Sequence, residues 1–169
     1  MSDAGAGELR IPEGCATVSS EPRPGAVAIA ASRFNAEVVQ RLLDGAVGRL
    51  DELAVSRQQV TVVLVPGAWE LPLACRRLAG SGRYRALVSL GCIVRGGTPH
   101  FQYVCSEAAR GIARVSLESG VPIGFGVLTC DTPEQAMERS GGRHGNKGAE
   151  AVDAALEMAG LLAALPGSG

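Results

Sequence analysis

Residues 91–101 read Gly-Cys-Ile-Val-Arg-Gly-Gly-Thr-Pro-His-Phe, and the elements of the chain are arranged around this stretch. The apolar run before it, residues 86–90, predicts a buried strand. After it, apolar residues recur at helical spacing: Val104, Ala108, Ile112 and Val115. The stretch is therefore predicted to be a strand-to-helix turn with paired glycines at the bend.

The start of the predicted helix is a candidate anion site. We expect Thr98 to be the N-cap and Pro99 to take the first helical position, which leaves the amides of His100 and Phe101 free. Free N–H groups and the positive end of a helix favour a phosphate group. Residues 96–99, the anion turn, lack the Gly-Lys-Ser/Thr and GxGxxG patterns of nucleotide loops, so they suit a small phosphate ester.

His100 is the candidate catalytic residue beside this turn. It is one of 2 histidines in the chain, and an imidazole can accept or donate a proton near neutral pH. By itself, a histidine near a helix start is more often a surface or hydrogen-bonding residue. We expect the other histidine, His144, to be exposed to solvent.

The chain alternates apolar runs with amphipathic segments. The expected strands cover residues 26–31, 60–65, 86–94 and 122–129, and we expect Gly124 and Gly126 to interrupt the last one. Alternating strands and helices favour a parallel sheet with helices on both faces. We therefore predict the α/β class, as a flavodoxin-like three-layer sandwich around a central four-stranded parallel sheet.

Capping residues mark the predicted helix ends. Asn35 is a candidate N-cap, and Thr132-Pro133-Glu134-Gln135 has the form of a capping box for a helix that runs to about Ser140. Gly141-Gly142 then break that helix. The final helix, roughly over residues 146–165, is expected to carry the apolar residues Val152, Leu156 and Leu162 and to stop before Pro166-Gly167.

The length of 169 residues suits a single domain. We expect this domain over residues 25–165, followed by a short C-terminal tail, residues 166–169. Residues 1–24 are rich in Gly, Ala, Ser, Pro and Glu. We expect this N-terminal segment to be mobile or to pair with a neighbouring chain, with Leu9–Ile11 as a short extended piece.

Composition excludes several functional classes. The net charge is -1 and the cationic residues are scattered, so we expect no basic face for nucleic acid. We expect no membrane-spanning segment and no signal peptide, because no apolar run is long enough. The 5 cysteines form no CxxC pair. They indicate buried thiols in a reducing compartment, so we expect a cytoplasmic protein without a structural metal.

Aromatic and charged residues follow the strand ends, where ligands bind in open parallel sheets. Phe34 and Trp69 are candidate platforms for a planar ring, because only 4% of the residues are aromatic. A lone Phe at such a position more often packs into the core. Glu70 suits a helix cap equally well. Arg139 and Lys147 are either ordinary helix-end cations or ligands for a phosphate at the anion turn.

Several separated motifs occur in collinear order. They are Ser32-Arg33-Phe34-Asn35, Pro-Gly-Ala-Trp-Glu-Leu-Pro at 66–72, the stretch 91–101, and Gly145-Asn146-Lys147-Gly148. Together they resemble the 6,7-dimethyl-8-ribityllumazine synthase family, over about residues 25–162. Several motifs in register are more specific than any one of them. Trp69 stands where the family usually has Phe, and Gly97 replaces a larger residue.

The resemblance implies a transferase of riboflavin biosynthesis that needs neither a metal nor a cofactor. The family condenses 5-amino-6-(D-ribitylamino)uracil with 3,4-dihydroxy-2-butanone 4-phosphate to 6,7-dimethyl-8-ribityllumazine, the penultimate step of the pathway. An amine adds to the ketone to give an imine, phosphate is eliminated, and the ring closes with loss of water.

The resemblance also implies roles for individual residues. Phe34 stacks on the pyrimidine, His100 transfers protons, and Arg139 takes the phosphate with Lys147 nearby. Phe125 closes the pocket from the neighbouring subunit. For the other positions, the resemblance implies that Ala68, Trp69 and Glu70 bind the ribityl and ring portion, that Cys92, Ile93 and Val94 line the pyrimidine side, and that Gly97 and Thr98 take the phosphate.

The resemblance further implies an assembly. Family members are pentamers with sites at subunit interfaces, and many pack twelve pentamers into a hollow icosahedral 60-mer. The bend at residues 140–145 is short and contains glycine, as in shell-forming members. We therefore expect a homopentamer and the 60-subunit shell, and riboflavin synthase is a candidate partner.

Two other functions stay open on the sequence alone. One is a non-catalytic flavin- or lumazine-binding shell protein of the same fold, although a pure binder has no need of His100, Arg139 and Lys147 together. The other is a flavodoxin-like enzyme that acts on a small phosphorylated sugar, which explains the anion turn but not two aromatic platforms. A receiver-type signalling domain is excluded, because the first strand ends without an acidic cluster for magnesium.

Overall fold

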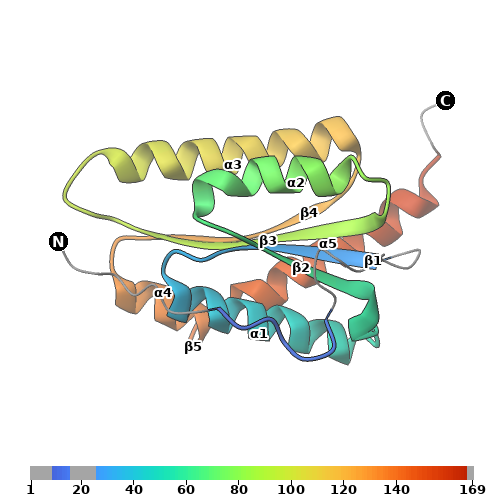
Figure 1. The fold of residues 1–169 in the computed structure, drawn as a ribbon, viewed down its shortest axis with the longest axis horizontal. Coiled ribbons are helices and arrows are strands. Elements are labelled where there is room, and N and C mark those ends of the chain that lie inside the picture. Colours follow the sequence, from blue (N-terminus) through green and yellow to red (C-terminus); the bar gives the residue numbers. More distant parts are fainter. Residues whose placement is uncertain (1–8, 16–25, 167–169) are drawn as a thin grey trace.

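A computed structural model describes residues 9–15 and 26–166. It confirms the predicted α/β class, because a four-stranded parallel sheet in the order β2-β1-β3-β4 lies between two layers of helices (Figure 1). The strands are β1 (Ala26–Ser32), β2 (Val60–Val65), β3 (Tyr84–Val94) and β4 (Ile123–Cys130). One face of the sheet carries α2 (Leu71–Ala79) and α3 (His100–Ser119), and the other carries α1 (Ala36–Glu52), α4 (Pro133–Arg139) and α5 (Lys147–Ala164).

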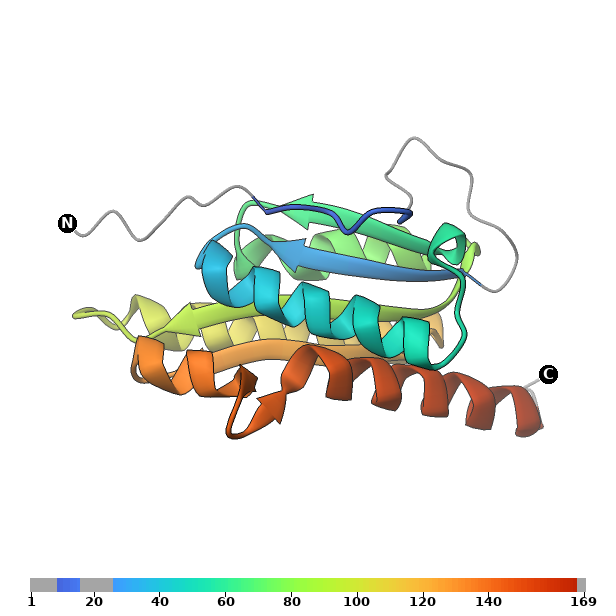
Figure 2. The same ribbon diagram turned by 90° about the horizontal axis from the view of Figure 1, so that it is seen from below.

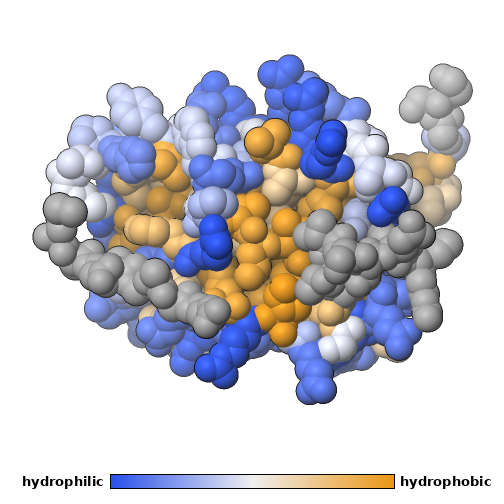
Figure 3. Space-filling view, in the orientation of Figure 1, coloured by the Kyte–Doolittle hydropathy of each residue, from blue (hydrophilic) through white to orange (hydrophobic). Residues whose placement is uncertain are grey.

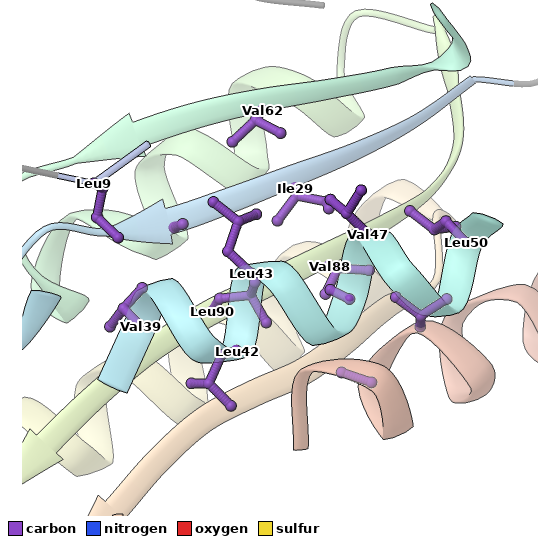
Figure 4. Close-up of a cluster of buried hydrophobic side chains, with 14 of the residues drawn as sticks. Leu9, Ile29, Val39, Leu42, Leu43, Val47, Leu50, Val62, Val88 and Leu90 are labelled. Atoms are coloured by element: carbon purple, nitrogen blue, oxygen red, sulfur yellow. The ribbon is translucent and has the colours of Figure 1, made fainter. Parts of the chain in front are cut away.

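Each face of the sheet has its own apolar core. Side chains alternate along a strand, so Val27 and Ile29 of β1 face α1 and α5, whereas Ala28 and Ala30 face α2 and α3. Figure 4 shows the first of these cores, with the leucines and valines of α1 packed against β1, β2 and β3. All of β1 is buried, as its continuous apolar run predicts for a strand covered on both faces.

The expected interruption of β4 was wrong. The strand runs unbroken from Ile123 to Cys130, and its glycines instead make room for α5. A Cβ added at Gly124 would stand 2.7 Å from the carbonyl carbon of Ala151 and closer still to its oxygen. Glycine is therefore required here because a helix backbone crosses the strand, not because the strand ends.

The start of α3 also differs from the prediction. The helix begins at His100, Pro99 occupies the cap position, and the Thr98 side chain makes no capping hydrogen bond. The reason is that Pro99 already has helix-like angles, φ -63 and ψ -8, and its carbonyl accepts from Gln102 N at 3.0 Å. The amides of His100 and Phe101 still find no acceptor within residues 26–166.

The predicted capping of α4 is confirmed, and the glycine-rich segment after it folds in an unexpected way. Thr132 accepts from Gln135 N at 3.3 Å. Beyond α4, the glycines form a small antiparallel hairpin of β5 (Ser140–Gly142) and β6 (Gly145–Asn146), not only a bend. Two short 3-10 helices, η1 (Arg57–Gln59) and η2 (Ala68–Glu70), precede β2 and α2.

The last turns of α5 leave the body of the domain (Figures 1 and 2). Val152 is fully buried, and Leu156 packs against the core. Leu162, in contrast, is 42% exposed. Nothing in the described residues covers the end of α5, where Leu161 and Leu165 are exposed as well.

Part of the N-terminal segment is placed. Residues 9–15 lie beside β2 and α1 (Figure 2), and Leu9 is buried in the core. Gln40 of α1 holds the backbone of Arg10 on both sides, accepting from its N–H at 2.6 Å and donating to its carbonyl at 3.0 Å. Most of the segment for which we expected mobility or pairing, residues 1–8 and 16–24, lies outside the described residues.

Among the described residues, none of the helices is both long enough and apolar enough to cross a bilayer.

Candidate active site

A pocket of about 310 Å³ opens at the carboxyl ends of β1, β2 and β3, at the edge where open parallel sheets bind ligands. The turns that follow these strands supply its walls. Eight of the residues singled out from the sequence line it together: Phe34, Ala68, Trp69, Cys92, Ile93, Val94, Thr98 and His100.

Two aromatic rings stand at the pocket without being part of the core. Phe34 is 58% exposed and Trp69 is 56% exposed. Their turns are joined through backbone hydrogen bonds, from Arg33 N to Val65 O at 2.8 Å and from Phe34 N to Pro66 O at 3.2 Å. The structure therefore favours the platform interpretation of these rings over core packing, since exposed aromatic faces are available to a planar ligand.

The wall contributed by β3 is apolar and chemically inert. Cys92 is 2% exposed, and Ile93 is also buried. Burial raises the pKa of the Cys92 thiol to about 12, and the nearby Cys130 adds to the effect. The thiol therefore stays protonated near neutral pH, and it is a packing group rather than a nucleophile.

His100 and the anion turn form the open side of the pocket. His100 is exposed at the first position of α3, and Gly96, Gly97 and Thr98 before it are exposed as well. The free amides at the start of this helix point out of a 20-residue helix, whose dipole adds a partial positive charge. The arrangement can hold an anion next to an imidazole, which is the chemistry that phosphate elimination with proton transfer requires.

Arg95 lies next to the pocket, and the sequence analysis did not single it out as a site residue. Its guanidinium carbon lies 4.4 Å from the ring centre of Phe101, which lines the pocket. Its Nε also lies 2.6 Å from a carboxylate oxygen of Asp131, at the end of β4. These contacts connect the first turn of α3 to the segment that leads into α4, although an exposed ion pair contributes little stability by itself.

The sequence of this chain matches a known family. A sequence model of 6,7-dimethyl-8-ribityllumazine synthase matches residues 25–163. The 6,7-dimethyl-8-ribityllumazine synthase of Desulfovibrio desulfuricans is 52% identical over 131 residues, which cover 78% of this chain and 84% of that protein. The chain belongs to the 6,7-dimethyl-8-ribityllumazine synthase family. Its predicted place in riboflavin biosynthesis, as a transferase, is thereby confirmed.

Glu70 does not line the pocket in this lumazine synthase family member. It lies at the end of η2, and its Oε2 accepts from the backbone N–H of Gly67 at 2.9 Å. The helix-cap interpretation therefore describes the contact that the structure shows. The carboxylate keeps a second oxygen, Oε1, for which the described residues supply no hydrogen-bond donor.

Phe125, Arg139 and Lys147 also lie away from the pocket of their own chain. Phe125 projects from the edge strand β4 and is 46% exposed. Arg139 donates from Nη1 to the carbonyl of Gln135 at 3.0 Å, and Lys147 pairs with Glu150 at 2.7 Å. A single chain therefore does not bring these three side chains to the anion turn, and Gly97 is not part of the pocket wall either.

Four further residues line the pocket: Gly67, Gly96, Phe101 and Val104. The sequence analysis placed Gly96 and the Phe101 amide at the anion turn, but it gave no pocket role to Gly67, to Val104 or to the Phe101 ring. Phe101 and Val104 carried the signal of an ordinary amphipathic helix, because their spacing is that of its buried face. Only the position of α3 against the ends of the strands turns part of that face toward the pocket.

Arg143 and His144 had no explanation from the sequence. In the structure both lie at the hairpin turn and approach Glu138, Arg143 at 2.9 Å and His144 at 3.7 Å. The described residues contain no group of three or more His, Cys, Asp and Glu side chains that could hold a metal ion.

Proposed function

We propose that this chain condenses 5-amino-6-(D-ribitylamino)uracil with 3,4-dihydroxy-2-butanone 4-phosphate to 6,7-dimethyl-8-ribityllumazine at the pocket described above. The observation that carries the proposal is the position of two exposed aromatic rings and His100 around one pocket of about 310 Å³, beside free amides of a helix start. Family membership supports the reaction, and the geometry supports the assignment of residues to its steps.

In this proposal the pyrimidine occupies the apolar part of the pocket. Phe34 and Trp69 offer faces on which a planar ring can stack, and the β3 wall of Cys92, Ile93 and Val94 excludes water from its edge. The ribityl chain extends toward Ala68 and Glu70, whose second carboxylate oxygen can accept from its hydroxyls.

The second substrate places its phosphate at the anion turn. Gly97, Thr98 and the free amides of α3 supply uncharged donors there. His100 is within the same turn of helix and can take the proton released as the imine forms, and then assist phosphate departure. Because the amine and the ketone are reactive by themselves, holding them in line supplies a large part of the rate.

We propose that a neighbouring copy completes the site. Phe125 is exposed on the free edge of β4, and Arg139 follows on α4, where neither reaches its own pocket. An exposed aromatic ring and a guanidinium on one edge suit a composite site, in which Phe125 closes the pocket and Arg139 neutralises the phosphate with Lys147 nearby. Each site would then lie at an interface of a homopentamer.

The opposite edge of the sheet supports the same assembly. Beyond β2 lies a groove of about 620 Å³, lined by apolar and arginine side chains that include Val63, Leu73 and Leu78. Figure 3 shows this face, where an apolar surface crosses the molecule between α2 and α1. Leu73 is 73% exposed. Within the described residues, no strand pairs with the outer edge of β2. Such an edge beside an apolar surface needs a cover, and a neighbouring chain with its N-terminal segment is the cover we propose.

We further propose that the pentamers form an icosahedral 60-mer, because the segment between α4 and α5 is a compact hairpin without an insertion. The free thiols of all 5 cysteines support the cytoplasm as compartment. Riboflavin synthase, which consumes a lumazine, is the partner we propose.

Assembly can be tested on the purified chain. Wild-type protein is expected to scatter light as a particle of about 1 MDa, near sixty times 17.3 kDa. Phe125→Asp is expected to shift the population to smaller species, because it places a charge in an apolar contact. The control is Leu53→Asp, a change at an exposed apolar residue at the end of α1. Wild-type pentamers alone would reject the shell, and wild-type monomers would reject the composite site.

The reaction itself is tested by mixing the assembled protein with both substrates and recording lumazine absorbance together with released phosphate. Both signals are expected to rise in equal amounts. A correctly assembled protein that gives neither signal above the uncatalysed rate would instead be the non-catalytic binding shell.

Trp69→Ala distinguishes a pyrimidine substrate from a phosphorylated sugar. Removing a stacking partner is expected to raise the KM for the ribitylaminouracil about tenfold, since loss of an aromatic platform for a base costs roughly 1–3 kcal/mol. The KM for the butanone phosphate should change less than about twofold. Tyr103→Ala is the matched control, because Tyr103 is 65% exposed and does not line the pocket. An unchanged KM for the pyrimidine in Trp69→Ala would contradict the platform role.

A further inference from the structure

Asn35 has an unusual position between two strands of the site. Its backbone is left-handed, with φ 57 and ψ 48, and its side chain does not cap α1 as the sequence suggested. The side-chain amide instead donates to the carbonyl of Cys92 at 2.9 Å, across 57 residues of sequence. Asparagine tolerates this backbone region better than most residues, because its short polar side chain can hydrogen-bond locally.

This hydrogen bond extends the seam between β1 and β3 beyond their backbone pairing. The last paired residues of the two strands are Ala31 and Leu90, and Cys92 lies two residues further along β3. The backbone carbonyl of Cys92 therefore has no hydrogen-bond donor in β1. The side-chain amide of Asn35 donates to it instead. On the other side of the turn, Arg33 and Phe34 donate to the end of β2.

Phe34 is therefore held by its neighbours on both sides. Its own N–H is bonded to Pro66 O at 3.2 Å, and the next residue is bonded to β3. The ring itself is 58% exposed. The backbone of the turn over residues 33–35 sets the direction in which the Phe34 side chain leaves the chain, and the partly buried hydrogen bond from Asn35 to Cys92 ties this turn to β3.

We propose that Asn35 is a positioning residue, which sets the Phe34 ring over the β3 wall so that the two form one binding slot for a planar ligand. The inference rests on the proposed function for the identity of that ligand. Asn35 does not line the pocket itself and would act through Phe34.

The test combines two substitutions at Asn35 with one at Phe34. Asn35→Gly keeps a backbone that tolerates positive φ but loses the amide, and Asn35→Asp keeps the size but replaces the donor by an acceptor. Both are expected to weaken binding of 6,7-dimethyl-8-ribityllumazine about fivefold to tenfold, as measured by equilibrium dialysis, because one partly buried hydrogen bond is lost. In the Phe34→Ala background the same substitutions should change binding less than twofold.

Stability is separated from positioning by a control in the core. Val152→Ala, at a fully buried position of α5, lowers the unfolding midpoint but is expected to leave lumazine binding within twofold of wild type. If Asn35→Gly does not assemble, lumazine binding by Asn35→Asp is compared with and without the Phe34 ring in its place. An equal loss of binding with and without the Phe34 ring, or no loss in either variant, would overturn the inference. Wild-type protein that neither binds the lumazine nor turns over would overturn the proposed function instead.

Discussion

Replacing His100 by alanine is expected to lower kcat by about 10-fold to 100-fold, at or below the low end of the range for general acid–base catalysis. The residue is exposed at the start of α3, next to the anion turn, where the proposed mechanism moves a proton and releases phosphate. Substantial activity should remain, because positioning of the two substrates by the pocket and the turn is untouched. Steady-state rates at saturating concentrations of both substrates provide the measurement.

The other histidine is a matched control. His144 lies at the hairpin turn, 3.7 Å from Glu138, and does not line the pocket. His144→Ala should therefore keep kcat within about twofold of wild type. Equal rates for His100→Ala and wild type, with assembly intact, would remove the imidazole from the mechanism and leave catalysis to proximity and anion binding.

Replacing Gly124 by valine is expected to destabilise the protein by roughly 3 kcal/mol or more, the upper end of what overpacking a core costs. The added Cβ would meet the backbone of α5 at Ala151, and a helix backbone cannot move aside as a flexible side chain can. The expected readout is a lower midpoint of urea unfolding, or a loss of soluble protein, at a matched protein concentration.

Gly48 provides the comparison for this substitution. It lies inside α1, and an added Cβ would meet nothing within 4 Å. Gly48→Ala is expected to be neutral or stabilising by up to about 1 kcal/mol, because alanine has the higher helix propensity. Similar midpoints for Gly124→Val and wild type would mean that α5 does not lie against β4 as described.

The layered fold was predictable because its signals are local. Each buried strand is a short apolar run, and β2 begins and ends at the residues predicted for it. Turn residues and helix periodicity fix the alternation of strands and helices, from which the parallel sheet follows. The motifs at the strand ends also identified the family that the comparisons confirm.

Errors arose where two segments distant in the sequence meet. Gly124 looks like a break in a strand, yet it is the contact point of a helix that begins more than twenty residues later. Asn35 takes the predicted N-cap position of α1, yet its side-chain amide bonds to Cys92 and not to the helix. A local pattern contains no information about the partner that such a residue finds across the fold.

The sequence by itself determined the fold class, the family, and the group of residues at the carboxyl ends of the strands, because each of these rests on short-range patterns. Only the tertiary structure decided that Phe34 and Trp69 are exposed at the pocket, that Glu70 bonds to Gly67, and that Arg139 lies outside the pocket of its own chain. The physical reason is that exposure and hydrogen-bond partners depend on which elements pack together, and packing brings residues from separate strands and helices into contact.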